Sequence, residues 1–177
     1  MAVAGKTEVL LAGMGEIKVA RGAGVLGCIG LGSCVGTLLY DPHAGAGALA
    51  HVMLPEPHDD DALRMPGKYA VSAVPALLKE LGLTPATASR LRAILIGGAE
   101  VFQNRESTLR IGERNVETLS RLLKELRISI AFSDTGGHRG RSFEFDLTTA
   151  ELVIRVVGQP PQVHSLSRAL GRMPIAV

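Results

Sequence analysis

The sequence contains no tryptophan, and aromatic residues make up only 3% of its 177 residues. A core with so few large rings has to be aliphatic, and the 21 glycines favour many short elements joined by tight turns. With 46% of its residues apolar, the chain is long enough to bury a core of its own. We therefore expect one compact domain rather than a few long helices.

Long hydrophobic runs and dense charge of one sign are also missing. Apolar stretches such as Val25 to Leu31 fall far short of the roughly 20 residues that span a bilayer, and the N-terminal apolar run is too short for a signal peptide. The net charge of +2 comes from interleaved acids and bases, which form no basic stripe for phosphates. These absences predict a cytoplasmic protein that neither inserts into a membrane nor binds nucleic acid.

Cysteine is scarce, because Cys28 and Cys34 are the only two. In a reducing cytosol such a close pair is expected to remain as thiols, one of which is a candidate for reactivity. The sequence has no CxxC motif, and its histidines lack metal-ligand spacing, so we expect neither a metal nor a cofactor. The five histidines stand at positions 43, 51, 58, 138 and 164.

The first third of the chain reads as strands separated by turn-forming residues, and hairpins are the simplest way to pair them. The predicted strands are Glu8 to Ala12, Glu16 to Ala20, Val35 to Tyr40 and Ala48 to Leu54. The acidic, proline-bounded segment Pro55 to Pro66 is predicted to be a solvated loop.

The middle of the chain mixes two helices with two strands. Apolar residues at three-and-four spacing predict amphipathic helices over Lys68 to Leu81, with a kink at Pro75, and over Glu113 to Leu126. Short β-rich runs at Leu91 to Ile96 and Ile128 to Ser133 predict buried strands.

Near the C-terminus, apolar and polar residues alternate over Ser142 to Leu147 and over Leu152 to Val156. This pattern predicts an antiparallel hairpin with one face exposed to solvent. The chain after Gly158 contains two prolines and is expected to be a loosely held extension. The pattern as a whole predicts an α/β fold in which helices pack beside strands.

A cysteine and a histidine on neighbouring predicted strands are the main candidates for chemistry. If the hairpin turns around Pro42 to Gly45, a register that pairs His51 with Gly36 places His51 diagonally across from Cys34. The two side chains then share one face, with roughly 7–8 Å between their backbones. A slip of one residue would send His51 to the opposite face.

Such a pair suits a nucleophile and its base, because a nearby imidazolium lowers the pKa of a thiol and populates the attacking thiolate. The flanking Gly30 and Gly32 are candidates to offer backbone N–H groups to an oxyanion. The pattern alone also fits a plainer interpretation, in which Cys34 is a small buried hydrophobe and His51 a satisfied core residue.

Two further glycine clusters, Ile96 to Phe102 and Asp134 to Phe145, follow predicted strands. Functional loops often occupy this position, but the clusters fit tight turns equally well. Within the second cluster, Arg139 and Arg141 are candidates to bind a carboxylate.

A collinear set of motifs resembles the CheD family of chemoreceptor glutamine deamidases over nearly the whole chain. The motifs are LGSCV from Leu31, YDP from Tyr40, AHVMLP from Ala50, KYA from Lys68, GGA from Gly97, IGERNVE from Ile111 and DTGGHRGRSFEFD from Asp134. The resemblance implies that Cys34 is the nucleophile and His51 the base. The family has a threonine six residues before the nucleophile, which orients the histidine, and Cys28 takes that position here.

The resemblance also implies a fold: a single layered α/β domain with a mainly antiparallel, β-sandwich-like core flanked by helices, similar to Cys-His toxin deamidases. The deamidase domain is then expected over residues 1–158, with a C-terminal extension over residues 159–177.

The function that the resemblance implies is that of a protein-glutamine glutaminase. It would hydrolyse glutamine side chains of methyl-accepting chemotaxis receptors to glutamate through a Cys thiolate and a thioester, with receptor methylesterase as a side activity and no cofactor. The CheC phosphatase is the implied regulatory partner. Two alternatives stay open: a non-catalytic adaptor that binds receptors or CheC, and a thiol peptidase or small-molecule amidase.

Overall fold

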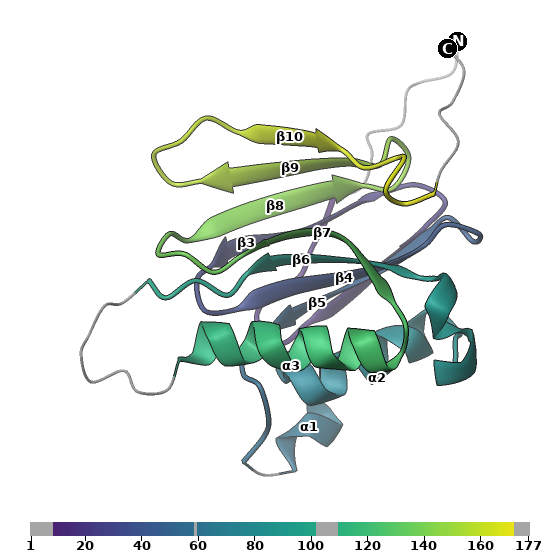
Figure 1. The fold of residues 1–177 in the computed structure, drawn as a ribbon, viewed down its shortest axis with the longest axis horizontal. Coiled ribbons are helices and arrows are strands. Elements are labelled where there is room, and N and C mark those ends of the chain that lie inside the picture. The colour runs from purple at the N-terminus through teal and green to yellow at the C-terminus, as the bar shows by residue number, and fades with distance from the viewer. Residues whose placement is uncertain (1–8, 59, 102–109, 172–177) are drawn as a thin grey trace.

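The described part of the chain consists of two stacked sheets and a layer of helices (Figure 1). It comprises residues 9–58, 60–101 and 110–171 of a computed structural model. The outer sheet has the order β1 (Val9–Leu11), β3 (Val25–Leu31), β8 (Arg141–Asp146), β9 (Glu151–Val156) and β10 (Gln162–Ser165). The central sheet has the order β2 (Ile17–Arg21), β5 (Ala46–Val52), β4 (Val35–Asp41), β6 (Arg92–Gly97) and β7 (Ser129–Thr135).

The two longer helices, α2 (Ala70–Glu80) and α3 (Ile111–Glu125), cover the face of the central sheet that points away from the outer sheet (Figure 1). Their apolar stripes supply Leu77 and Leu119 to a core shared with β4, β5 and β6, as the helical spacing predicts. The remaining helical segments are α1 (Asp61–Arg64), η1 (Pro66–Lys68) and η2 (Pro85–Arg90). No helix among the described residues is long and apolar enough to span a bilayer.

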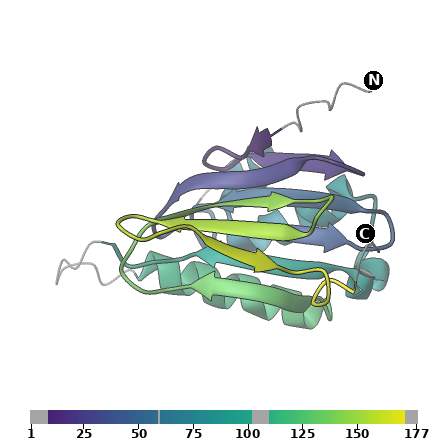
Figure 2. The same ribbon diagram turned by 90° about the horizontal axis from the view of Figure 1, so that it is seen from above.

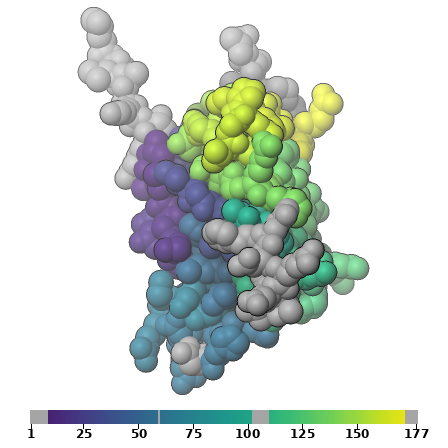
Figure 3. All heavy atoms as spheres, turned by 90° about the vertical axis from the view of Figure 1, so that its left-hand side faces the viewer, coloured from purple at the N-terminus to yellow at the C-terminus, as the bar shows by residue number. Residues whose placement is uncertain are grey.

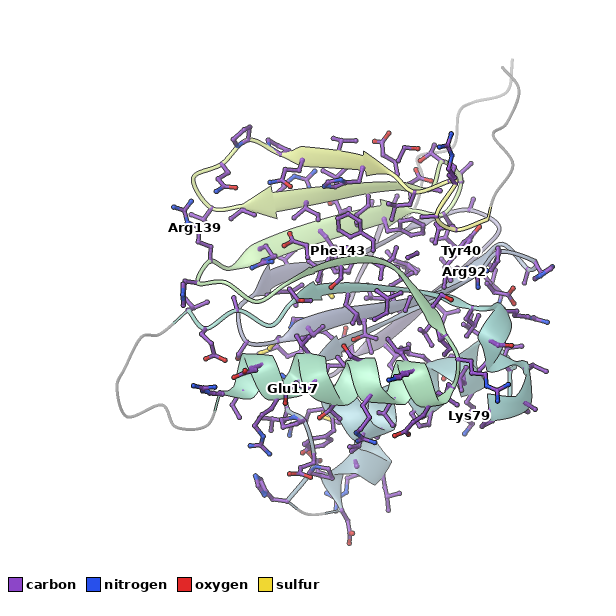
Figure 4. The ribbon with its side chains drawn as sticks, in the orientation of Figure 1. Tyr40, Lys79, Arg92, Glu117, Arg139 and Phe143 are labelled. Atoms are coloured by element: carbon purple, nitrogen blue, oxygen red, sulfur yellow. The ribbon has the colours of Figure 1, made fainter. Side chains whose placement is uncertain are left out.

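A second core fills the space between the two sheets (Figure 2 looks onto the outer sheet). Alternating residues of β8, including Phe143 and Phe145, point inward and are fully buried. Phe145 meets Tyr40 of β4 edge to face at 5.8 Å between ring centroids, and Phe143 lies in the same layer (Figure 4). The few aromatic side chains therefore concentrate where the sheets meet.

Most predicted elements are confirmed, including the mainly antiparallel sandwich, helix α3 and the hairpins β4–β5 and β8–β9. Hairpin pairing of the first two strands is wrong, because β1 pairs in parallel with β3 while β2 pairs with β5 in the other sheet. Strand β3 was not predicted, since its glycines interrupt the alternation that marks a strand.

Three local predictions need correction. Strand β7 is the edge of the central sheet and is partly exposed, with Ile130 42% exposed, so it is not a buried strand. The acidic segment contains α1, whose Asp61 accepts hydrogen bonds from Lys68 and Tyr69. The described residues 159–171 are not loosely held, because β10 pairs with β9 and the following Leu170 is fully buried. The predicted ends Glu8 and Phe102 lie outside the described residues.

Candidate functional site

The register of the β4–β5 hairpin brings Cys34 and His51 to one face of the central sheet. Gly36 pairs with His51, as predicted, and Cys34 directly precedes β4, two residues before Gly36. Cys34 packs against the core between the sheets, and Leu49, which shares a strand face with His51, belongs to the same core. The cysteine and histidine are therefore diagonal neighbours on the face that looks toward the outer sheet.

The ring of His51 is held by the turn that joins β1 and β2. Its Nδ1 lies 3.0 Å from the carbonyl oxygen of Ala12, and the backbone of His51 is hydrogen-bonded to Gly15 and Glu16 of the same turn. A carbonyl oxygen only accepts, so Nδ1 carries the ring proton and Nε2 the lone pair. Nε2 is buried and has no hydrogen-bond partner within the described residues, which leaves it ready to accept a proton.

The thiol of Cys34 is half-buried, and this burial raises its pKa, while its own backbone N–H lowers the pKa in part. The sequence argument expected an imidazolium to lower this pKa, and the structure gives the opposite direction. Removing the thiolate from water is the cause, because desolvation disfavours the charged form. This burial favours the thiol form of Cys34 over the thiolate.

Cys28 lies in β3 opposite Phe143 and is fully buried. Burial first, and then the nearby charge of Cys34, raise the pKa of its thiol to about 12. Both cysteines are free thiols. Across the described ranges no hydrogen bond joins Cys28 to His51, whose Nδ1 is already taken by Ala12.

Cys34 opens into a cavity of about 480 Å³ at the end of the molecule shown in Figure 3. The cavity gathers residues from β3, β8 and β9 of the outer sheet, from the loops next to β4 and β6, and from the start of α3. His51 is not among its described lining residues. The described lining residues are Gly30, Gly32, Ser33, Cys34, Ala99, Glu100, Val101, Ile111, Gly140, Arg141, Ser142, Arg155 and Val157.

Of the two glycines predicted to offer N–H groups, Gly30 is already occupied, because its N–H donates to Ser142 Oγ at 3.0 Å. The carbonyl oxygens of Gly32 and Cys34 accept from the N–H groups of Ala99 and Gly98, at 2.8 Å each, which fixes the loop that carries Cys34. The backbone N–H of Cys34 lies close enough to its own sulfur to stabilise the thiolate.

Comparison with known proteins shows the family of this chain. The family model described as "CheD chemotactic sensory transduction" matches residues 53–156. The Chemoreceptor glutamine deamidase CheD of Thermotoga maritima is 42% identical over 152 residues, which cover 86% of this chain and 94% of the relative. The chain belongs to the CheD family.

Two other CheD relatives align over a similar share of the chain. The Probable chemoreceptor glutamine deamidase CheD of Pyrococcus abyssi is 43% identical, over 85% of this chain and 93% of its own length. That of Desulforamulus reducens is 37% identical, over 85% of this chain and 92% of its own length.

Arg139 and Arg141 of this CheD chain, which were predicted to bind a carboxylate, differ from each other in their surroundings. Arg141 is buried, and its Nη atoms bond to the carboxylate of Asp134 and to backbone oxygens of the loop after β7, so its role is to organise that loop. Arg139 projects from the same loop at the tip of the molecule (Figure 4). No cluster of His, Cys, Asp and Glu in the described ranges could hold a metal ion.

Sequence reasoning missed Ala12, because a backbone carbonyl leaves no mark on side-chain pattern. The residue is buried beside β1 and donates its own N–H to Gly27 at 2.9 Å, so its position depends on the pairing of β1 with β3. That pairing is parallel and between strands that are distant from the histidine in sequence. No local signal could have found it.

Proposed function

We propose that this chain hydrolyses the side-chain amides of glutamines in chemoreceptors to glutamate, with Cys34 as nucleophile and His51 as base. The names of the relatives state chemoreceptor glutamine deamidation, and the family supports the same reaction here. The observation that carries the proposal is the buried, unpartnered Nε2 of His51 on the same face as Cys34. A buried ring nitrogen without a partner calls for an explanation, and a role as proton acceptor supplies one.

In the first half-reaction, Nε2 of His51 takes the proton of the Cys34 thiol as the sulfur attacks the amide carbon. The backbone N–H of Cys34 stabilises the oxyanion that forms. His51 then donates this proton to the departing nitrogen, ammonia leaves, and a thioester remains. Because the resting thiol is neutral, proton transfer accompanies attack.

In the second half-reaction, a water molecule enters the cavity and His51 removes its proton as the oxygen attacks the thioester carbon. The C–S bond breaks, the sulfur recovers the proton from His51, and glutamate is released. Because His51 acts in both half-reactions, its ring has to keep one orientation throughout. We propose that Ala12 orients the ring and that Cys28 contributes to the site by packing alone.

The same geometry supports a receptor methylesterase side activity, because a glutamate methyl ester presents the same carbonyl with an easier leaving group. We propose CheC as a regulatory partner on the strength of the family resemblance. We also place the reaction in the cytoplasm, where two free thiols persist.

The deciding experiment incubates a chemoreceptor signalling fragment with the protein and maps the receptor peptides by mass. Wild type should convert specific glutamines to glutamates, whereas Cys34→Ser and His51→Ala should lower conversion by roughly a thousandfold or more, since each removes a reacting group. Cys28→Ser is the matched control, because it makes the same change of sulfur to oxygen at a thiol that does not react.

Conversion that persists in Cys34→Ser would end the proposal. Receptor binding by wild type without any conversion would instead identify an adaptor. Conversion of free glutamine or of peptide bonds in preference to receptor side chains would identify an amidase or peptidase. The folded fraction of each variant is checked by circular dichroism.

A further inference from the structure

Asn115 of α3 ties together the two strands that carry the proposed nucleophile and base. Its Nδ2 donates two hydrogen bonds of 3.0 Å each, one to the carbonyl oxygen of Ser33 and one to that of Met53. Ser33 directly precedes Cys34, and Met53 follows His51 by two residues. One buried amide group thus contacts both halves of the site from behind the sheet.

The bonds lie where the β4–β5 ladder has ended. The last paired residues are Val35 and Val52, and beyond them the N–H groups of Met53 and Leu54 bond to Lys68 instead of to the nucleophile loop. Asn115 provides a direct connection between the two chain segments at this end of the hairpin.

The chemistry of the contact is specific for asparagine. Two carbonyl acceptors need two N–H donors from one short side chain, which aspartate lacks in its charged form and which glutamine would hold one methylene further out. This arrangement costs stability, because Oδ1 of Asn115 is buried without a hydrogen-bond partner in the described structure. Leucine would fill a similar volume, but it would leave the carbonyl oxygens of Ser33 and Met53 without this donor.

The helix that presents Asn115 is itself fixed to the nucleophile loop. Oε1 of Glu100 accepts from the N–H groups of Gly112 and Glu113 at the start of α3. The adjacent Gly98 and Ala99 donate to the carbonyl oxygens of Cys34 and Gly32. The first turn of α3 therefore cannot move independently of Cys34.

We propose that Asn115 is a positioning residue that sets the distance between the thiol of Cys34 and the imidazole of His51. The inference rests on the proposed function of that pair. Loss of the clamp should release the nucleophile loop, which lowers catalysis because a reacting group displaced by about 1 Å costs on the order of 100-fold in rate. The same release should expose Cys34, which is half-buried in the intact site.

The test measures two rates that should move in opposite directions in Asn115→Leu. We expect kcat for receptor deamidation to fall roughly tenfold or more with KM nearly unchanged, because the cavity lining is untouched. Alkylation of Cys34 by iodoacetamide, mapped by mass, should become severalfold faster. Arg90→Met is the control, since it removes an ion pair with Asp41 at the opposite end of the same hairpin and should leave both rates unchanged.

The inference is overturned if Asn115→Leu leaves both rates at their wild-type values, or changes them only as much as Arg90→Met does. If wild type shows no deamidation at all, the proposed function fails, and the alkylation rate alone decides whether Asn115 holds the loop. If Asn115→Leu does not fold, Asn115→Asp replaces it, because aspartate has the same shape and lacks both donors when charged.

Discussion

At the scale of single residues, burial decides the properties of the two thiols. Cys28 is fully enclosed, and burial holds its pKa at about 12, whereas Cys34 borders a cavity and keeps access to a substrate. A thiol that cannot ionise neither attacks nor exchanges. The fold thus gives different surroundings to two thiols only six positions apart in the sequence, because one is enclosed and the other borders a cavity.

The raised pKa of Cys28 predicts a loss of stability in alkali. The folded protein keeps a proton that the unfolded chain, with a solvated thiol at 9.0, releases, so the contribution is complete below pH 9.0 and is lost as the pH rises to about 12. We expect the free energy of unfolding in urea to fall less steeply over this range in Cys28→Ala than in wild type. Tyrosine and lysine titrate equally in both proteins, and parallel curves would contradict the prediction.

The residues of the proposed dyad could be predicted from the sequence, whereas those that position it could not. Cys34 and His51 are chemically distinctive and lie on strands joined by a short turn, so local pattern sufficed to fix their register. Ala12 acts through a backbone oxygen and Asn115 through contacts across the fold. Asn115 did leave one signal, because it is a polar residue four positions before Leu119 on the apolar stripe of α3.

At the scale of elements, close backbone approach fixes the end of β6 under the nucleophile loop. A Cβ added at Gly97 would lie 2.3 Å from the carbonyl oxygen of Cys34, and the backbone of Gly97 has φ +114. The neighbouring N–H of Gly98 donates to that same oxygen. A side chain at Gly97 therefore has to displace the backbone of Cys34.

Gly97→Ala should lose about 2–4 kcal/mol of unfolding free energy and most of the deamidase activity of the folded fraction. Urea denaturation and the receptor assay measure the two effects. Gly82→Ala is the matched control, because Gly82 also has a positive φ of +70 but has open space around its Cβ position. The steric argument fails if both variants lose the same stability and keep the same activity.

Elements whose apolar residues recur at a regular spacing were predicted well. The features that depend on which strands pair with each other were not. The stripe of α3 and the alternation of β8 are local and survive in the structure. The parallel partners of β1 and of β7 lie far along the chain, and the edge position of β7 follows from the order of the whole sheet. Local sequence carries little information about either.

At the scale of the whole molecule, a partly buried ion pair joins the two sheets beside the cavity. Arg141 belongs to β8 of the outer sheet and Asp134 to β7 of the central sheet, with 2.5 Å between Nη1 and Oδ1. The guanidinium also bonds to the backbone oxygens of Asp134 and Gly136. These contacts close the end of the sandwich at which the proposed reaction takes place.

Arg141→Met should therefore cost about 2–4 kcal/mol of unfolding free energy, because it strands a partly buried carboxylate and several carbonyl oxygens without their donor. Arg155→Met is the control within the same sheet. Arg155 also lines the cavity, but its ion pair with Glu144 is exposed and lies within one sheet, so its loss should cost less than about 1 kcal/mol. Urea denaturation compares the two, and equal losses would show that the Arg141 bridge contributes no more to the joining of the sheets than a surface pair does.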